Sequence, residues 1–233
     1  MALPKIDLPI FELKLPSTGK KIKYRPFTVK EEKILLVAQE SKETSQEILA
    51  VKQIVNNCLI DIDISEIAMF DLEYIMLMLR SRSVDNTIEF SIKDPDTNES
   101  IKLSLDIEKV KVLKSEEHSN KIKINDEYTL FLKYPTIDQY IKISDLDQSD
   151  PLLNYYMMIG CLDKLASEDE VHNFKDYSDE EIDAFVETFS GDVVKGIQRF
   201  FETMPKLRHE LPYKNKNGDE KTFVIEGTKT FFS

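Results

Sequence analysis

Short stretches in which apolar and polar residues alternate recur along this chain, and a turn sequence divides each stretch into two halves. These pairs lie at 11–24, 87–107, 121–133 and 211–225. Alternation places every second side chain on one face of a strand, and an Asn-Gly turn such as Asn217–Gly218 is a strong hairpin signal. The pattern therefore predicts four antiparallel β-hairpins.

Sequences that begin α-helices lie between the predicted hairpins. Thr28 and Glu31 have the spacing of a capping box, in which each side chain accepts a hydrogen bond from the other residue's backbone N–H, and Thr44 and Glu47 repeat it. Caps and apolar periodicity predict helices at 28–41, 44–59, 65–82 and 191–204, and others that begin at Thr136, Asp150 and Ser178. Hairpins that alternate with capped amphipathic helices indicate an α+β protein.

One sequence order occurs twice and indicates two lobes of related build. A hairpin, a proline, a threonine cap and a helix follow one another around Pro26 and again around Pro135. The polar run at 114–120 has the composition of a linker. We expect an N-terminal lobe of residues 1–114 and a C-terminal lobe of residues 121–233 that ends in a β-hairpin, with a single domain as the alternative.

Charge is distributed unevenly along the 233 residues, whose net charge is −12. Residues 163–192 contain eleven acidic and two basic side chains, whereas residues 14–33 contain seven basic and two acidic ones. A negative molecule repels phosphate backbones, so we expect no nucleic-acid partner. The two regions are either solvated surface or sites of contact with a basic partner or between copies of the chain, and such contacts weaken as salt rises.

Catalytic and metal-binding patterns are absent from the sequence. The residues His118, His172 and His209 stand alone, and Cys58 and Cys161 are read as small buried apolar residues. The acidic stretches are polar enough to leave their carboxylates hydrated and ordinary. We therefore expect no enzyme, no cofactor and no metal site. No apolar run reaches the roughly 20 residues of a membrane span, and no signal peptide pattern is present, so we expect a cytoplasmic protein without a membrane partner.

Six residues are candidates for partner binding. Basic side chains gather on the first predicted hairpin, and two aromatic residues lie near the end of the sequence, where such side chains either dock onto the body or insert into a partner. The candidates are Lys20, Lys21, Lys23, Arg25, Phe231 and Phe232.

Two segments carry a resemblance to a known family. Residues 15–33 read LPSTGKKIKYRPFTVKEEK, and residues 200–207 read FFETMPKL and precede the last hairpin. Both resemble the T-even-type baseplate hub assembly proteins of contractile-tailed phages, and the length and order of elements match as well. Some members carry cysteine pairs near the C-terminal hairpin, and this chain has none there, so the resemblance gives no reason to expect a metal site.

The resemblance implies a role in building the baseplate hub and implies other hub proteins as partners. It leaves open an assembly chaperone, found in the host cytoplasm, and a permanent hub subunit of the virion baseplate. The net charge of −12 suits a chaperone that stays in solution by itself, and we favour that role. An acidic module that mimics nucleic acid, based on residues 163–192, is the hypothesis from another class, and a hydrolase hidden in the acidic surface is the third.

Overall fold

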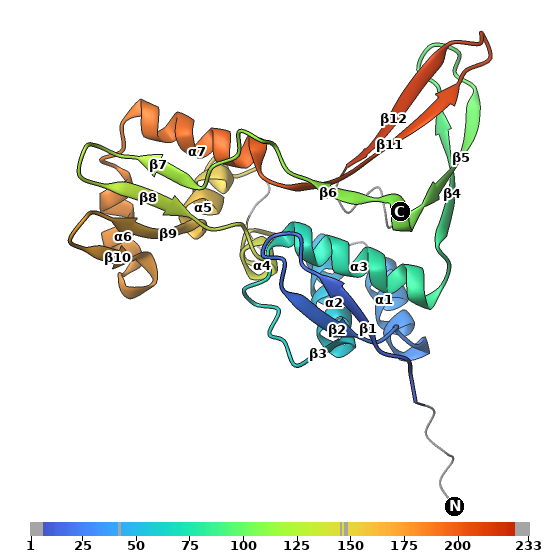
Figure 1. Cartoon of the computed structure of the whole chain (residues 1–233), viewed down its shortest axis with the longest axis horizontal. Coiled ribbons are helices and arrows are strands. Elements are labelled where there is room, and N and C mark those ends of the chain that lie inside the picture. The colour runs from blue at the N-terminus through green and yellow to red at the C-terminus, as the bar shows by residue number, and fades with distance from the viewer. Residues whose placement is uncertain (1–6, 42, 145, 147–148, 227–233) are drawn as a thin grey trace, which may run out of the picture. The chain divides into compact units, whose positions relative to one another are not determined.

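The computed structural model describes residues 7–41, 43–144, 146 and 149–226. Within these residues the chain forms seven α-helices and several small antiparallel β-sheets, which confirms the predicted α+β class (Figure 1). The chain divides into two compact units. Unit 1 comprises Met1–Leu113 together with Lys206–Ser233, and unit 2 comprises Lys114–Pro205.

Unit 1 begins with a three-stranded antiparallel sheet of order β1-β2-β3, made of β1 (Phe11–Lys14), β2 (Lys21–Tyr24) and β3 (Leu59–Ile60). Phe11 pairs with Tyr24 and Lys14 with Lys21, so β1 and β2 form the first predicted hairpin. Along β2 the side chains of Ile22 and Tyr24 are buried while those of Lys21 and Lys23 are exposed. The alternation in the sequence therefore separates a core face from a basic outer face.

Three helices complete this part of unit 1, namely α1 (Val29–Ser41), α2 (Thr44–Cys58) and α3 (Met69–Ser83). Helix α3 buries Leu72, Ile75 and Leu79 completely, and its apolar run at 75–79 is core, as its composition predicts. Its start differs from the expected Ser65. The N–H of Ser65 donates to Oδ1 of Asp63 at 2.9 Å, and this local turn delays the helix to Met69.

The predicted cap at Thr44 is wrong in its position. Helix α2 includes Thr44 as its first residue, and the N-cap is Glu43, whose side chain accepts no capping hydrogen bond. The predicted cap at Thr28 is confirmed in its main part. The backbone N–H of Thr28 donates to Oε2 of Glu31 at 2.9 Å, whereas the Thr28 hydroxyl caps Lys30 rather than Glu31.

Two long hairpins of unit 1 lie side by side (Figure 1). One consists of β4 (Thr87–Lys93) and β5 (Ser100–Asp106), and the other of β11 (Lys206–Lys214) and β12 (Glu220–Glu226). Their half-buried faces meet at Phe90 and Phe223, whose ring centroids are 5.8 Å apart. Gly218 has φ of +87° in the turn of the second hairpin, a conformation that explains the preference for glycine there.

A buried carboxylate joins the far ends of these two hairpins. Asp94, in the β4–β5 turn, is fully buried and accepts hydrogen bonds from the N–H and hydroxyl of Thr97 at 2.9 and 3.0 Å. It also accepts one from the Tyr213 hydroxyl on β11 at 2.9 Å and lies 3.3 Å from Nζ of Lys221 on β12. We call Asp94, Thr97, Tyr213 and Lys221 the hairpin clasp.

The second hairpin joins unit 1 through a third strand. After the 3₁₀ turn Ile107–Lys109, strand β6 (Lys111–Leu113) pairs antiparallel with β11, and Lys206 lies opposite Leu113. The sequence division into lobes of residues 1–114 and 121–233 assigned this hairpin to the C-terminal lobe, whereas the contacts group it with unit 1. The buried side chains that it shares with α3 and the neighbouring strands are Leu77, Leu105, Ile107, Val110, Leu207 and Ile225.

Unit 2 is built on a four-stranded antiparallel sheet of order β10-β9-β8-β7. Its strands are β7 (Lys121–Lys123), β8 (Thr129–Leu132), β9 (Leu162–Ala166) and β10 (Val171–Asn173). The third predicted hairpin corresponds to β7 and β8. The pair β9–β10 was not predicted, since it lies in the acidic region where charged residues interrupt the apolar alternation.

The helices of unit 2 are α4 (Ile137–Ser144), α5 (Leu153–Gly160), α6 (Asp179–Val186) and α7 (Gly191–Thr203). Ser178 and Glu181 form a complete capping box at α6, as predicted. Asp150 accepts from the N–H of Leu152 at 2.8 Å, so α5 begins later than the expected Pro151.

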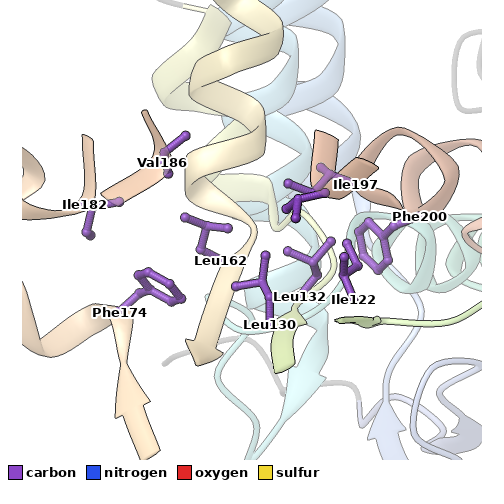
Figure 2. Close-up of a cluster of buried hydrophobic side chains, with 10 residues drawn as sticks. Ile122, Leu130, Leu132, Leu162, Phe174, Ile182, Val186, Ile197 and Phe200 are labelled. Carbon is purple, nitrogen blue, oxygen red and sulfur yellow. The ribbon is translucent and has the colours of Figure 1, made fainter. Parts of the chain in front are cut away.

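Helix α7 and the four-stranded sheet contribute most of the unit 2 core. Figure 2 shows Phe200 and Ile197 at one end of this cluster and Phe174 and Ile182 at the other, with Leu162 between them. A Cβ on Gly196 would lie 2.9 Å from Cγ2 of Ile122, so glycine at this position allows α7 to pack closely on β7.

His118 is half-buried and packs against this core, although its sequence surroundings are those of a linker. Its ring nitrogens lie 3.0 Å from the Thr203 hydroxyl and 2.9 Å from the Tyr134 hydroxyl, and its ring packs on Phe200. Burial, with a smaller contribution from Lys114, lowers the pKa of His118 below its ordinary value. His118 therefore fixes the start of unit 2 to the end of α7.

Candidate interaction surfaces

The basic outer face of the first hairpin carries three of the six predicted residues. Lys20 lies in the β1–β2 turn and Lys21 and Lys23 on β2, and all three side chains are exposed. Nζ of Lys21 lies 3.9 Å from Oε2 of Glu12, but both side chains are more than half exposed, so this ion pair is weak. These lysines form one positively charged patch, which we call the basic face.

Arg25 is placed differently from the three lysines. Its Nη2 lies 3.0 Å from Oε1 of Glu31, and its Nη1 donates to the carbonyl of Pro26 at 2.9 Å. Glu31 is completely buried, and burial by itself would raise its pKa. The hydrogen bonds from Arg25 and Thr28 outweigh that effect and hold the pKa of Glu31 at about 2. Arg25 therefore secures the start of α1, and its contact with a partner stays a prediction.

Phe231 and Phe232, the other two predicted residues, lie outside the residues that the structure describes.

Helix α1 carries an exposed apolar stripe that the sequence analysis did not identify. Val29, Leu36 and Val37 are 64%, 55% and 69% exposed. Residues separated by seven or eight positions lie on one side of a helix, so the three side chains form one stripe. The spacing of these apolar residues was visible in the sequence. The same spacing also fits a helix face that packs against the core, and only the structure shows that this face is exposed.

The acidic region of residues 163–192 contains β9, β10, α6 and the first residues of α7. Its carboxylates are exposed, including those of Glu168, Asp169, Glu180 and Glu187. Within this region the structure forms an apolar cavity of about 290 Å³ that is partly open to solvent. The side chains of Leu165, Phe174 and Phe185 supply much of its apolar wall. Sequence reasoning did not identify this cavity, because its walls come from β9, β10, the 3₁₀ turn Phe174–Asp176 and α6 together.

Polar groups lie at the edge of this cavity. Nδ1 of His172 lies 2.7 Å from the Tyr177 hydroxyl, and Nε2 lies 3.0 Å from Oε2 of Glu170. Glu181 also lines the cavity, and its carboxylate accepts the N–H of Ser178 at 2.9 Å in the capping box of α6. Each of these polar side chains is thus held in place by a neighbour.

The cysteines are buried, as expected from the sequence. Burial raises the pKa of Cys58 to about 11 and that of Cys161 to about 12, so both thiols are protonated at neutral pH. Among the described residues no group of three or more His, Cys, Asp or Glu side chains is placed to hold a metal ion. None of the helices in the described ranges combines the length and apolar character of a membrane span.

Comparison with known proteins adds one finding. The model of the family described as T4 bacteriophage base plate protein matches residues 8–233, which include both units and both segments on which the resemblance rested. No curated protein and no solved structure matches the chain significantly. A family match over nearly the whole length identifies the family, and the chain belongs to the T4 bacteriophage base plate protein family.

Proposed function

We propose that this protein acts in assembly of the phage baseplate hub, as a non-enzymatic chaperone that binds hub proteins in the host cytoplasm. The observation that carries the proposal is the family match over residues 8–233. The role within the baseplate rests on the surfaces of the two units. The basic face and the acidic region provide contacts that form and separate readily, because contacts between exposed charges are weak individually and screened by salt.

The net charge of −12 supports a chaperone rather than a permanent subunit, since a strongly charged surface keeps a protein in solution when it is not bound. One observation favours the alternative. The stripe of Val29, Leu36 and Val37 on α1 is exposed in the isolated chain, and a permanent interface would cover such side chains. A permanent hub subunit is therefore the second candidate function.

A pull-down from phage-infected cells, with this protein as bait, distinguishes the two when it is combined with mass spectrometry of purified virions. The chaperone role predicts that hub proteins are recovered with the bait and that the bait is missing from virions. If the protein is present in virions at a fixed copy number, its role is that of a permanent hub subunit and not that of a chaperone. Recovery of host proteins alone would overturn the role in hub assembly.

The basic face is the surface that we propose for the first contact with a hub partner. Reversing the charge of Lys20, Lys21 and Lys23 to glutamate should reduce recovery of hub proteins at least fivefold, because three exposed charge pairs contribute up to about 1 kcal/mol each. The contact of the unaltered protein should also weaken as salt is raised.

A matched control reverses the same amount of charge elsewhere on unit 1. Lys93, Lys102 and Lys216 are exposed, and their replacement by glutamate changes the net charge equally. Recovery that falls to the same extent in both triple variants would assign the effect to net charge and would contradict the basic face as a binding surface.

A further inference from the structure

The cavity of unit 2 differs from an ordinary gap in the core because it reaches the surface on one side. Phe174 and Ile182, at its base, are only 8% and 9% exposed and belong to the core cluster in Figure 2. Tyr177, at its edge, is 41% exposed. A side chain from another molecule therefore has an apolar base to contact and an open edge through which to enter.

The size of the cavity limits what it holds. An apolar cavity of roughly 150 Å³ is large enough for benzene, whereas pockets for drug-sized ligands and cofactors start at roughly 300 Å³. The volume of about 290 Å³ lies between these values. It suits one aromatic side chain and the first atoms of the backbone that carries it. The aromatic walls at Phe174 and Phe185 provide ring faces and edges for such a side chain.

The acidic side chains around the cavity favour an occupant with positive charge. Glu181 lines the edge, and Glu170 reaches it through its contact with His172. The sequence around these residues, from Asp163 to Asp192, has eleven acidic and two basic side chains. An acidic occupant would be repelled, and lysine or arginine beside the inserted side chain would be attracted.

We propose that this cavity is a docking site for an aromatic side chain that a partner protein presents between lysine or arginine residues. The inference rests on the proposed function in one respect, that the partner is a baseplate protein, and it adds the chemistry by which that partner is recognised. A central aromatic residue in a pocket, surrounded by complementary charge, is the usual composition of a strong contact point between proteins.

The chain's own basic region does not match this description. Its aromatic side chains are Tyr24, which is 3% exposed, and Phe27, which is half-buried, and Tyr24 packs against Phe11 at a centroid distance of 5.7 Å. The described part of residues 14–33 thus presents basic side chains without an exposed aromatic ring. The basic region of a second copy therefore does not fit the cavity, and we assign the cavity to a different protein.

A peptide that contains tryptophan tests the proposal directly, because the protein has no tryptophan and the peptide's fluorescence is observed without background. The probe is a capped Lys-Lys-Trp-Lys-Lys peptide titrated with the full chain. Its emission should shift to shorter wavelength and its anisotropy should rise as the ring enters an apolar site. The matched Glu-Glu-Trp-Glu-Glu peptide should bind at least tenfold more weakly.

Variants of the full chain locate the binding. Tyr177→Ala should weaken binding of the lysine peptide about tenfold, because it removes an aromatic contact at the edge of the cavity that receives the peptide's ring. The control is Tyr156→Ala, which removes a tyrosine on α5 that is 39% exposed and does not line the cavity. This control should bind as the unaltered protein does, and circular dichroism verifies that both variants are folded.

The charge at the edge is tested separately. Glu181→Gln removes the charge and keeps an oxygen that accepts the N–H of Ser178, so the cap of α6 is retained. It should weaken the lysine peptide about two- to fivefold, the range of one exposed charge pair, and the difference should disappear at high salt.

Three results would overturn the inference. The first is equal binding of the two peptides, and the second is equal weakening by Tyr177→Ala and Tyr156→Ala. The third is self-association of the chain, detected by sedimentation, that Tyr177→Ala abolishes, because a second copy would then be the occupant. If the peptide tests fail, the pull-down from infected cells still recovers hub proteins. Failure of the docking proposal is therefore distinguishable from failure of the hub-assembly proposal.

Discussion

Single buried carboxylates fix several junctions of this protein, and Glu31 is the clearest example. It is completely buried, yet it accepts hydrogen bonds from Arg25 and from both the N–H and the hydroxyl of Thr28. These bonds favour its ionised form, and its pKa is about 2. The Glu31 side chain thereby accepts the Thr28 N–H at the start of α1 and, through Arg25, holds the end of β2 beside this helix.

Replacing this carboxylate tests its contribution. Glu31→Gln should lower the free energy of unfolding by about 1–3 kcal/mol at pH 7, because the buried hydrogen bonds lose their charge. The neighbouring Glu32 is exposed, and Glu32→Gln is the control, with an expected change within about 0.5 kcal/mol. Urea denaturation of both variants measures the difference.

The same position predicts a dependence on pH. A carboxyl whose pKa is lower in the folded state than in the unfolded state, where it is roughly 4.3, stabilises the fold above that value. The stabilisation disappears as pH falls towards about 2. The difference in free energy of unfolding between the unaltered protein and Glu31→Gln should therefore narrow as pH falls from about 4.5 to about 2. A constant difference over this range would contradict the role of the charge.

At the scale of elements, the long hairpins depend on one another. A two-stranded hairpin is marginally stable by itself, and in unit 1 two hairpins bury one face of each against the other. The hairpin clasp joins them far from the helices. Burial would raise the pKa of Asp94, but its hydrogen bonds with Thr97, Tyr213 and Lys221 outweigh burial and hold it well below the ordinary value.

Removing one donor of the clasp should loosen both hairpins at this end. Tyr213→Phe keeps the ring and deletes the hydroxyl that donates to Asp94. We expect backbone amide exchange at residues 94–99 and 215–219 to accelerate roughly fivefold, the factor for one net hydrogen bond. Asp126→Ala, in the exposed β7–β8 turn, is the control and should leave both segments unchanged. Faster exchange in only one hairpin would contradict the mutual dependence.

At the scale of the whole molecule, the chain leaves unit 1 at Leu113 and returns to it at Lys206. Unit 2 is continuous in sequence and has its own core, whereas unit 1 is completed by β11 and β12. This arrangement separates two structural proposals. Lobes of residues 1–114 and 121–233 would each fold by themselves, whereas the grouping of contacts predicts that residues 114–205 fold by themselves.

Truncation distinguishes the two arrangements. We expect residues 114–205 to give a cooperative thermal transition and dispersed amide resonances. Residues 1–113 should be destabilised by several kcal/mol, because the partners Leu207 and Ile225 are missing and each buried side chain contributes roughly 1.5–3 kcal/mol. A stable fragment of residues 1–113 would support the division into sequential lobes.

The sequence by itself determined the local elements of this protein. Turn residues and caps act over a few positions, so Asn217–Gly218 and the box of Ser178 and Glu181 specified a hairpin and a helix start without any tertiary contact. The exposure of Lys21 and Lys23 likewise follows from alternation along one strand. The resemblance of residues 15–33 and 200–207 specified the family.

The tertiary structure decided which distant segments meet. Pairing of β11 with β6 joins residues about a hundred positions apart, and no local pattern encodes a partner at that distance. The β9–β10 pair forms because Leu162 and Phe174 are buried in the unit 2 core, a gain that outweighs the charged residues between them. The role of Arg25 and the apolar cavity also depend on contacts between distant segments. Which side chains become buried is decided by segments remote in sequence, so burial is established only when the whole unit has folded.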